Sequence, residues 1–253
     1  MPRRFARRPA WTAPGVSEHI QRVYAIIIAG GKGERLRPLT NDRPKSMVPL
    51  LDKPILEHQL VWLRENGVTD VVVACGYLHS VIEEYFGDGA KWGLNVAYSI
   101  EDTPLGRGGA LKLGYAQVPG EEPLIIATNG DTVNTQSLAP MIEQHKETGA
   151  VGTLLLTQLR SPFGIVRQEG ERIVGFEEKP LLPHWVSAGV YVLERSFFAD
   201  LPDVGDHEDE LFPRLAADGR LYGFRSDAYW KAIDTVKDLN EAADQLARAG
   251  GGS

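Results

Sequence analysis

A glycine-rich loop with several basic side chains is the densest chemical signal in the sequence. Residues 29–40 read AGGKGERLRPLT and follow directly on the apolar run YAIIIA. Glycine lets a backbone approach a ligand closely, so the amides of such a loop can converge on phosphate oxygens at the carboxyl edge of a sheet. Arg35 and Arg37, with Lys45 shortly after them in RPKSMVPL, add positive charges that suit a triphosphate better than a single carboxylate.

Two common nucleotide-binding loops do not fit these residues. The loop lacks the Gly-Lys-Ser/Thr ending of a P-loop, and Leu36 stands where the dinucleotide fingerprint needs a third small residue. On the residues alone, a plain glycine turn with solvated arginines is an equal alternative.

Two aspartates far apart in the chain could hold a divalent cation. Asp131 in Asn129-Gly130-Asp131 follows the apolar run PLIIAT, so it is expected at the carboxyl end of a strand, where ligands bind in parallel sheets. Mg2+ needs few protein carboxylates because water and substrate phosphates complete its shell, and Asp234 in YWKAID is the candidate second ligand. The alternative is that Asp131 caps a turn and Asp234 caps a helix that starts near Thr235.

A basic residue at another strand end could meet a phosphate. Glu178-Lys179-Pro180 closes the run IVGFEEK, and Pro180 indicates the rim of a sheet because proline cannot donate to a strand ladder. On the residues alone, a solvated strand end explains this polarity better than a binding role for Lys179.

The segment around Glu101 could recognise a base. A carboxylate only accepts hydrogen bonds, so Glu101 could accept two from guanine N1 and N2, whereas uracil and thymine offer a single donor. Residues 104–110 (PLGRGGA) follow, and their adjacent glycines would permit close approach of a flat ring. Arg107 in this segment could reach a phosphate or lie in solvent.

The elements that must position these residues alternate between short apolar runs and amphipathic segments, which is typical of an α/β protein. Four strands covered on both faces are expected in the first half, at residues 23–29, 70–75, 94–99 and 123–128. Helices are expected at residues 54–66, 79–86, 107–116 and 137–148, the first with a proline start and a stop at Gly67 and the last with a Ser137 cap.

After Gly149 the pattern changes to closely spaced extended segments. Strands are expected at residues 151–158, 163–167, 172–178, 186–193 and 221–225, and helices near 207–218 and 235–248. No linker separates the two halves, so we expect one domain over residues 23–248, with a nucleotide-binding half at 23–149 and a substrate-binding half at 150–248.

The composition is that of a soluble globular protein. Of 253 residues, 43% are hydrophobic and 24% are charged, and the apolar runs are too short to span a membrane. A single cysteine, Cys75, excludes an intramolecular disulfide and a cysteine zinc site, and a cytoplasmic location is expected. The net charge of -7 argues against a nucleic-acid partner.

The two ends of the chain differ from the rest in composition. Residues 1–22 carry five arginines against one glutamate, and we expect a flexible Arg-rich extension, with a transit peptide or a nucleic-acid arm as alternatives. Residues 249–253 (AGGGS, counting from Ala249) are expected to be a disordered tail. The sequence is compatible with a homo-oligomer.

The motifs together resemble the sugar-1-phosphate nucleotidyltransferase family, also called nucleotide-sugar pyrophosphorylases. The resemblance runs in order through AGGKGERLRPLT, PKSMVPL, PLGRGGALKLG, NGD, EKP, SAGVYV and WKAID, about residues 23–246. It implies a mostly parallel, Rossmann-like central sheet flanked by helices. It also implies the family reaction, in which a nucleoside triphosphate and a sugar 1-phosphate give a nucleotide sugar and pyrophosphate. The chain stops soon after its closing helix, so the C-terminal left-handed β-helix of many relatives is expected to be missing.

The resemblance also implies a role for each matching residue. The catalytic residues would be Arg35, Lys45, Asp131 and Lys179. The nucleotide-binding residues would be Ala29, Gly30, Gly31, Gly33, Arg35, Lys45, Glu101, Pro104, Gly106 and Asp131. The sugar-binding residues would be Asn129, Gly164, Glu178, Lys179, Ser187 and Gly189. Asp131 and Asp234 would hold Mg2+.

Three features bear on which substrates this chain would take. Ser187 stands where many members of the family carry asparagine, and Arg107 where many carry threonine. The segment DELFPRLAADGRLYGF and the acidic residue before PLG resemble mannose-1-phosphate guanylyltransferases. This resemblance implies GTP with a mannose-type sugar 1-phosphate. UTP or dTTP with a glucose- or N-acetylmuramate-type substrate is the alternative, and a catalytically silent nucleotide-sugar-binding subunit is an alternative of another class.

Overall fold

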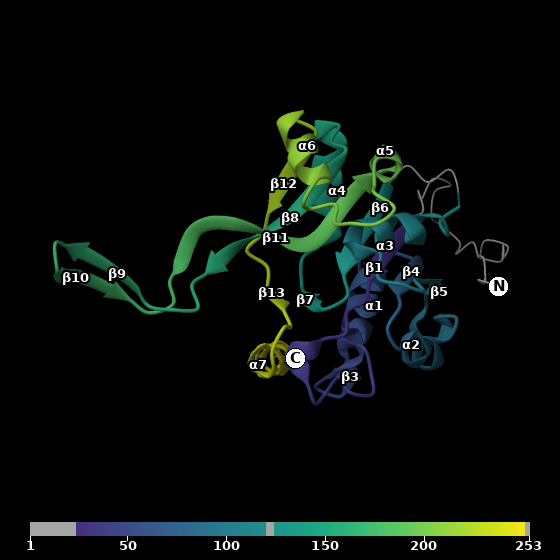
Figure 1. Ribbon diagram of the computed structural model, residues 1–253, viewed down its shortest axis with the longest axis horizontal. Coiled ribbons are helices and arrows are strands. Elements are labelled where there is room, and N and C mark those ends of the chain that lie inside the picture. The colour runs from purple at the N-terminus through teal and green to yellow at the C-terminus, as the bar shows by residue number, and fades with distance from the viewer. Residues whose placement is uncertain (1–23, 120–123, 251–253) are drawn as a thin grey trace.

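Seven strands form the central sheet, and six of them point the same way (Figure 1). The structure is a computed structural model, and it describes residues 24–119 and 124–250. Across the sheet the order is β12 (Leu221–Arg225), β8 (Gly152–Arg160), β11 (Leu181–Glu194), β6 (Leu124–Asn129), β1 (Tyr24–Ile28), β4 (Asp70–Cys75) and β5 (Asn95–Ile100). Only β11 is antiparallel to its neighbours, β6 and β8. The predicted α/β class with a mostly parallel sheet is therefore confirmed.

The apolar runs form the centre of the sheet because both of its faces are covered. Alternate residues of β1 enter separate clusters, with Ala25 and Ile27 on one face and Tyr24 and Ile26 on the other. β4 is buried along its whole length and matches the predicted strand at 70–75 residue for residue. A strand that is buried on both faces requires an uninterrupted apolar run, and this run is why the sequence predicts β4 closely.

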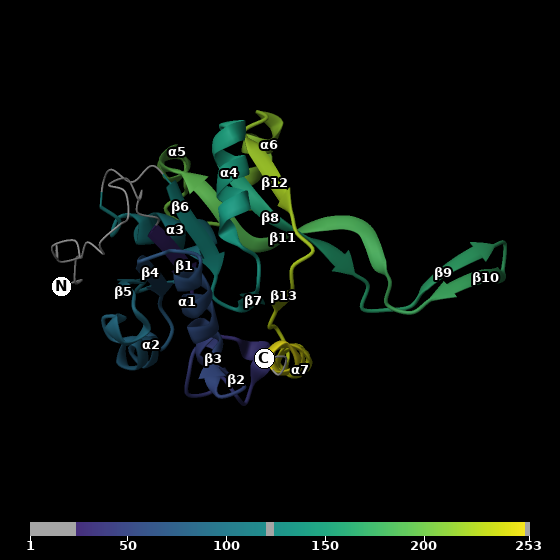
Figure 2. The same ribbon diagram turned by 180° about the vertical axis from the view of Figure 1, so that it is seen from behind.

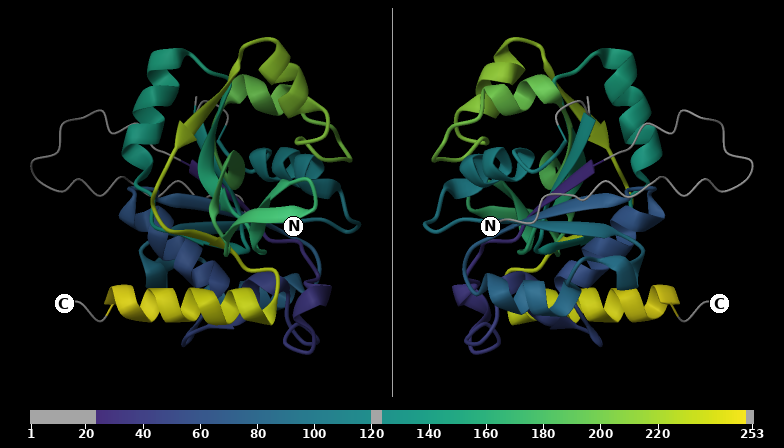
Figure 3. Two further views of the ribbon diagram at one scale, coloured as in Figure 1. Left: turned by 90° about the vertical axis from the view of Figure 1, so that its left-hand side faces the viewer. Right: turned by 90° about the vertical axis from the view of Figure 1, so that its right-hand side faces the viewer.

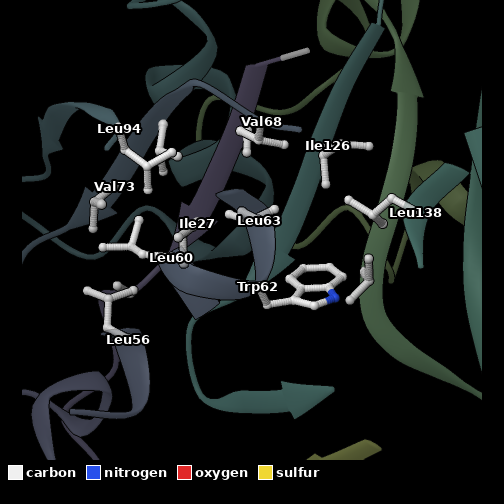
Figure 4. Packing of buried hydrophobic residues seen from close by; sticks show 14 of the residues in the cluster. Ile27, Leu56, Leu60, Trp62, Leu63, Val68, Val73, Leu94, Ile126 and Leu138 are labelled. Carbon is white, nitrogen blue, oxygen red and sulfur yellow. The ribbon is translucent and has the colours of Figure 1, made fainter. Parts of the chain in front are cut away.

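Helices cover both faces of the sheet in the described part of the chain. On one face lie α1 (Ile55–Glu65), α2 (His79–Phe86) and α4 (Leu138–Thr148), and on the other lie α3 (Gly106–Tyr115), α5 (Arg195–Ala199) and α6 (Leu211–Ala217). Figure 4 shows Trp62 and Leu63 of α1 among the buried side chains that pack on Ile126 of β6. The Trp62 indole donates a 2.7 Å hydrogen bond to the carbonyl of Gln136, so its one polar atom is satisfied.

A third cluster lies where β1 and β6 end, and it is built from short elements and the last helix. These elements are the strands β2 (Pro49–Leu50), β3 (Lys53–Pro54), β7 (Thr132–Asn134) and β13 (Trp230–Ala232), the helix α7 (Val236–Gly250), and the short 3-10 helices η1 (Glu34–Leu36) and η2 (Lys45–Met47). A third 3-10 helix, η3 (Ala90–Trp92), is not part of this cluster. Leu36, Val133, Ile233 and Ala242 meet in this cluster. Figure 3 shows α7 lying along one side of the molecule beneath the sheet.

A long hairpin projects from the body of the molecule (Figures 1 and 2). It is formed by β9 (Ile165–Glu169) and β10 (Arg172–Glu177), and the outer parts of β8 and β11 connect it to the sheet. We call residues 159–181 the arm. Strands were expected at 163–167 and 172–178, and the structure confirms them, but their separation from the body was not expected.

Several element boundaries differ from the predictions for identifiable reasons. α6 begins at Leu211 rather than near 207, and α5 and the β7–β13 pair were not predicted. Pro54 precedes α1 rather than starting it. Ser137 makes no side-chain cap at α4; instead the Leu138 amide donates to the Asn66 side chain across a 72-residue separation. α7 extends to Gly250, so Ala249 and Gly250 of the expected tail are helical.

Four predictions concern either residues outside the described ranges or features that can be reported only for the described ranges. The Arg-rich extension at 1–22 and the tail at 251–253 lie outside the described residues. No left-handed β-helix occurs within residues 24–119 and 124–250. Within the same ranges, no helix has the length and apolar character needed to cross a membrane.

Candidate active site

The two aspartates that the sequence singled out converge because of the β7–β13 ribbon. Asp131 directly precedes β7 and Asp234 follows closely on β13, and the two strands pair antiparallel with Thr132 opposite Ala232. The ladder continues one step further, since the Ile233 amide donates a 2.9 Å hydrogen bond to the Asp131 carbonyl. The pairing thereby holds the β13 segment, 100 residues further along the chain, beside the end of β6.

Lys45 binds both carboxylates at once. Its ammonium lies 2.7 Å from Asp131 Oδ2 and 2.6 Å from Asp234 Oδ1, and its side chain is mostly buried. Arg35 adds a second cation, with a 2.8 Å hydrogen bond to Asp234 Oδ1. The ammonium offsets the repulsion between two carboxylates that would otherwise face each other.

This arrangement fits a hard divalent cation held with help from substrate. The carboxylates of Asp131 and Asp234 face the same point, and the Lys45 ammonium already binds both of them there. The described residues hold no cluster of three or more His, Cys, Asp or Glu side chains placed for a metal, so the protein would supply these two groups alone. Mg2+ is commonly bound in this way, by one or two carboxylates together with phosphates and water.

The glycine-rich loop closes around the same point. The Ala29 amide bonds to the Ala74 carbonyl, the Lys45 amide donates to the Gly31 carbonyl, and the Thr40 hydroxyl donates to the Gly33 carbonyl. These bonds hold residues 29–33 between the end of β1 and the segment that carries Lys45.

Glu101 lies against this loop from the end of β5. A Cβ atom at Gly30 would come within 2.7 Å of Glu101 Oε1, so a side chain there would displace the carboxylate. Its Oε2 accepts a 3.1 Å hydrogen bond from the Leu105 amide, which fixes the 101–105 turn ahead of α3. Glu101 is therefore positioned by the loop on one side and by its own turn, which contains Pro104, on the other.

The glycines of α3 lie against the 203–205 loop. A Cβ at Gly106, Gly108 or Gly109 would lie within 2.8 Å of the backbone carbonyl oxygens of Asp203 or Gly205. The Gly108 amide also donates a 2.8 Å hydrogen bond to the Gly205 carbonyl. The adjacent glycines therefore allow α3 to pack against the 203–205 loop. Their contact with a flat ring stays a prediction.

An open cavity of about 420 Å3 begins at the two aspartates. It is lined by Arg107, Asn129, Asp131, Thr132, Ser187, Ala188, Gly189, Glu208, Phe212, Trp230, Ala232 and Asp234. Gly189 has a φ of 69°, and a Cβ there would lie 2.4 Å from the Asn129 amide nitrogen, so only glycine lets β11 pass this close to the end of β6. The structure thus brings Asn129, Ser187 and Gly189 together with the aspartates.

The far wall of the cavity contains a charged cluster that the sequence did not reveal. Arg107 pairs with Asp206 at 3.0 Å and with Glu208, and Glu208 also accepts a 2.7 Å hydrogen bond from the Tyr191 hydroxyl. Hydrogen bonding to Arg107 lowers the pKa of Asp206 below its usual value. Arg107 therefore neither lies free in solvent nor points to an open anion site. The acidic residues at 206 and 208–210 fall at the start of the helix expected near 207–218, and their pairing with Arg107 was not predicted.

Gly164, Glu178 and Lys179 lie on the arm, outside the cavity lining. Glu178 is next to Gly164, since a Cβ at Gly164 would come within 3.0 Å of Glu178 Oε2, and the exposed Lys179 ammonium lies 3.9 Å from Glu178 Oε1. Residues 181–186 of β11 lie between this group and Ser187, a path of about 20 Å at the usual rise of a strand. The structure does not bring these three residues to the aspartates.

Buried titratable residues away from the cavity do not have the properties of nucleophiles. Cys75 is buried in β4, and burial raises the pKa of its thiol to about 12, so the thiol stays protonated. Burial also lowers the pKa of His207 to about 4, among the aromatic rings of Tyr191, Phe197 and Phe212. Cys75 is a packing residue at the end of β4.

Comparison with known proteins identifies the family of this chain. A family model described as Nucleotidyl transferase matches residues 24–249, nearly the whole described chain. The chain belongs to the nucleotidyl transferase family. The resemblance seen in the motifs is therefore confirmed.

The most similar relatives include several members of this nucleotidyl transferase family with named substrates. A mannose-1-phosphate guanylyltransferase of Mycobacterium tuberculosis is 36% identical over 238 residues, which cover 90% of this chain and 65% of the relative. A D-glycero-alpha-D-manno-heptose 1-phosphate guanylyltransferase of Aneurinibacillus thermoaerophilus is 34% identical, with coverages of 88% and 97%. A UTP–glucose-1-phosphate uridylyltransferase of Synechocystis is 31% identical, with coverages of 86% and 62%. The chain thus spans less than two thirds of the length of the first and third relatives.

Solved structures support the same fold for this nucleotidyl transferase. HddC of Yersinia pseudotuberculosis superposes with a TM-score of 0.72 at 24% identity, over 88% of this chain and 99% of HddC. HddC complexed with GMP-PN gives a TM-score of 0.70 at 23% identity, with the same coverages. At these identities the likeness concerns the fold alone.

Proposed function

We propose that this chain makes a nucleotide sugar from GTP and a mannose-type sugar 1-phosphate, with release of pyrophosphate. The observation that carries the proposal is the convergence of Asp131 and Asp234 on Lys45 beside the glycine-rich loop. Guanylyltransferases of mannose 1-phosphate and of a manno-heptose 1-phosphate, at 36% and 34% identity, support the choice of substrates.

The reaction is a direct displacement at phosphorus. An oxygen of the sugar 1-phosphate attacks the α-phosphorus of the triphosphate; the new P–O bond forms as the bond to the β-phosphate oxygen breaks, and pyrophosphate leaves. No general base is required because a phosphate oxygen is already ionised near neutral pH. Since both reactants are anions, the main tasks of the protein are to hold them in line and to offset their repulsion.

The basic side chains around the aspartates are proposed to perform these tasks. Arg35 and Lys45 would donate to the β- and γ-phosphates, and the loop amides at 29–33 would contact the same groups. In the structure both side chains donate to Asp234, so the carboxylates hold the cations next to the loop until phosphate competes for them.

Asp131 and Asp234 are proposed to hold Mg2+. When bound, the ion would polarise the phosphoryl oxygens and neutralise charge that develops on them. The side chains themselves supply two oxygen ligands at the carboxyl end of β6 and the end of β13, and the ribbon keeps these ligands together.

The sugar is proposed to occupy the cavity between the aspartates and the Arg107–Glu208 pair. Asn129, Ser187 and the Gly189 backbone offer polar groups along its wall. Lys179 and Glu178 are proposed to contact the sugar phosphate, which requires the arm to take a different position relative to the cavity. Replacing Lys179 by alanine would then raise the KM for the sugar 1-phosphate and leave the KM for the triphosphate nearly unchanged.

Selection of guanine is proposed to rest on Glu101. A carboxylate can accept from both guanine donors, whereas a glutamine at this position presents one donor and one acceptor. Glu101→Gln is therefore expected to lower kcat/KM with GTP at least about tenfold, about the value of one hydrogen bond to a charged group, and to lower it less with UTP.

The decisive experiment measures pyrophosphate release with pairs of substrates. GTP, UTP and dTTP would each be combined with mannose, glucose and N-acetylmuramate 1-phosphates in the presence of Mg2+. The expected result is the highest kcat/KM for GTP with mannose 1-phosphate. A preference for UTP with glucose 1-phosphate would favour the alternative that the uridylyltransferase relative supports. Release with no pair, together with tight binding of a finished nucleotide sugar, would favour a catalytically silent subunit.

A further inference from the structure

The far wall of the cavity holds more acidic than basic charge. Its charged residues are Arg107, Asp206 and Glu208, which we call the far-wall cluster. Arg107 and Glu208 line the cavity, whereas Asp206 lies outside the lining and contacts Arg107. One guanidinium against two carboxylates leaves the cluster with a single net negative charge.

Hydrogen bonds hold these three groups in fixed positions. Arg107 Nε and Nη2 donate to the two oxygens of Asp206 at 3.2 and 3.0 Å, and the Arg107 amide donates to Asp206 at 2.7 Å. Glu208 accepts on both of its oxygens, from Arg107 Nη1 and from the Tyr191 hydroxyl, which suits an ionised carboxylate. The charges of the cluster are therefore fixed at the cavity rather than free to turn into solvent.

The titratable side chains next to the cluster do not neutralise it. Burial lowers the pKa of His207 to about 4, so its imidazole is uncharged at neutral pH. Burial also raises the pKa of Tyr191, so its hydroxyl keeps the proton that it donates to Glu208. Among the described residues that line the cavity, Arg107 is the one base against three acids, which are Asp131, Glu208 and Asp234.

Arg107 cannot offer an acidic ligand the contact that a guanidinium forms best. Its Nε–Nη2 edge is a fork that pairs with a carboxylate, and Asp206 already occupies this edge. Nη1 donates to Glu208, which leaves single N–H groups rather than a fork for a ligand. A sugar hydroxyl, which needs one donor or one acceptor, suits such a wall better than a carboxylate does.

The two ends of the cavity therefore differ in charge. At the aspartates, Lys45 and Arg35 supply one cation for each carboxylate, and that end suits a phosphate. A sugar 1-phosphate with its phosphate at this end directs carbons 3, 4 and 6 of the ring toward the far wall, because these carbons lie away from C1 in a pyranose. Substituents on those carbons would meet the far-wall cluster.

We propose that the far-wall cluster restricts this enzyme to sugar 1-phosphates that are uncharged at the end remote from C1. Glu208 accepts hydrogen bonds from hydroxyls there, and Glu208 and Asp206 together repel a carboxylate or a second phosphate. The inference rests on the proposed function, because it requires the sugar to occupy the cavity. It excludes N-acetylmuramate 1-phosphate, which carries a carboxylate on its O3 substituent.

A comparison of GDP-mannose with GDP-mannuronic acid tests this proposal. The two differ only at C6, which carries a hydroxymethyl group in one and a carboxylate in the other. Isothermal titration calorimetry of the full chain with Mg2+ gives a Kd for each. We expect the wild type to bind GDP-mannuronic acid at least about tenfold more weakly, because like charges repel strongly in a partly buried site. Equal Kd values, tighter binding of the acid, or binding of neither compound would overturn the proposal.

Asp206→Asn separates the effect of charge from the effect of shape. The asparagine keeps the size of the side chain, removes one negative charge and releases Arg107 Nη2 from its carboxylate partner. This variant is expected to bind GDP-mannuronic acid at least about threefold more tightly than the wild type does, a gain that misfolding could not produce. Glu208→Gln also removes one charge and is expected to lower the ratio of the two Kd values, so the test does not depend on one variant.

Asp203→Asn is the matched control. Asp203 pairs with Lys112 at 2.7 Å and lies outside the cavity lining, and its replacement changes the net charge by the same amount. This variant is expected to keep the wild-type ratio of the two Kd values. Asp206→Asn and Glu208→Gln variants that keep this ratio as well would overturn the proposal.

Pyrophosphate release from GTP tests the proposed function separately. A wild type that binds GDP-mannose selectively but releases no pyrophosphate with mannose 1-phosphate would contradict the proposed reaction and support the selection by the far-wall cluster. Release with mannose 1-phosphate and mannuronic acid 1-phosphate at similar kcat/KM would support the reaction and overturn the selection.

Discussion

Lys45 is the side chain on which the candidate site depends most directly. Its ammonium lies within 2.7 Å of one carboxylate and 2.6 Å of the other, and Arg35 contacts the second of these. Two carboxylates at such short range would repel strongly in a partly buried position. One lysine therefore holds both proposed metal ligands close together.

Replacing Asp131 by asparagine is expected to reduce turnover without unfolding the protein. The amide keeps the size of the side chain but removes one of the two proposed charged ligands. We expect kcat to fall at least about a hundredfold, or roughly 2.7 kcal/mol of barrier. Asp203→Asn is the control, since Asp203 also pairs with a lysine but lies outside the cavity. Near-normal activity of Asp131→Asn would rule out its assignment as a metal ligand.

Replacing Lys45 by methionine is expected to make the stability depend on Mg2+. The two carboxylates then face each other without the ammonium, and the loss of two charged hydrogen bonds is expected to lower the free energy of unfolding by roughly 2 kcal/mol. Added Mg2+ should raise the Tm of this variant and leave that of the wild type nearly unchanged. Lys112→Met removes an exposed pair and should show no such response. A Tm of Lys45→Met that does not respond to Mg2+ would argue against a cation site here.

His207 is expected to destabilise the fold in mild acid. Burial lowers its folded pKa to about 4 from the usual 6.5, against the opposing pull of Glu208 and Asp206, so the unfolded chain binds a proton that the folded chain does not. Stability is therefore complete above about pH 6.5 and falls as the pH drops toward 4, by roughly 3 kcal/mol in all. His207→Phe should flatten this part of the pH profile of urea unfolding. An unchanged slope between pH 6 and roughly 4.5 would contradict the assignment.

At the scale of elements, the β7–β13 ribbon brings the two proposed metal ligands together. It consists of three residues on each side, and it joins Asp131 to Asp234. The Trp230 indole anchors it by a 2.8 Å hydrogen bond to the Ala188 carbonyl of β11, at the cavity wall. The ribbon thus connects the proposed metal ligands to the proposed sugar pocket.

The N-terminus of helix α4 is capped by a side chain that is distant in the sequence. The Leu138 amide donates to Asn66 Oδ1 at 2.7 Å, and Asn66 also donates to the Trp62 carbonyl, while Ser137 makes no cap bond. Asn66→Ala is expected to lower the free energy of unfolding by about 1 kcal/mol or more, as loss of an N-cap usually does. Ser137→Ala should cost clearly less. Equal losses in urea unfolding of the two variants would contradict this account.

The sequence alone predicts those elements whose boundaries are set by neighbouring residues along the chain. β4 is a continuous apolar run, and the α1 region shows helical periodicity with Gly67 as its stop, so both were predicted closely. The cap of α4 comes from Asn66 and the start of α6 is delayed by contacts of Glu208 with Arg107 and Tyr191, so local patterns could not place them. Three-residue strands such as β7 and β13 are too short for a period to be visible.

The candidate site was predictable in part for the same reason. Asp131 lies at the end of a recognisable strand, and the motif containing Asp234 resembles the family pattern, so their convergence could be anticipated. The bridging position of Lys45 depends on tertiary packing and was not foreseen. The position of Lys179 depends on the path of β11 and the arm, and no short-range pattern fixes that path.

At the scale of the whole molecule, the site is joined to the core but is not required for it. The two large apolar clusters lie on the faces of the sheet, and the carboxylates lie beyond the ends of β6 and β13, held by Lys45. Chelation of divalent cations is therefore expected to stop turnover while the Tm changes by less than about 1 °C, since no measurable folding free energy would come from the metal. Turnover assays and calorimetry of the same chelated sample check this. A large fall in Tm on chelation would show that a metal supports the fold elsewhere.

The ribbon also has a consequence for how the protein is made. Asp234 reaches Asp131 only after β13 has paired with β7, and β13 lies close to the carboxyl end of the sequence. A ribosome-bound chain that has released the nucleotide-binding half alone would hold one acidic group without its companion. Under the proposed function, such a nascent chain would lack the second proposed metal ligand, so turnover would have to wait until the last strand of the ribbon has been synthesised and paired.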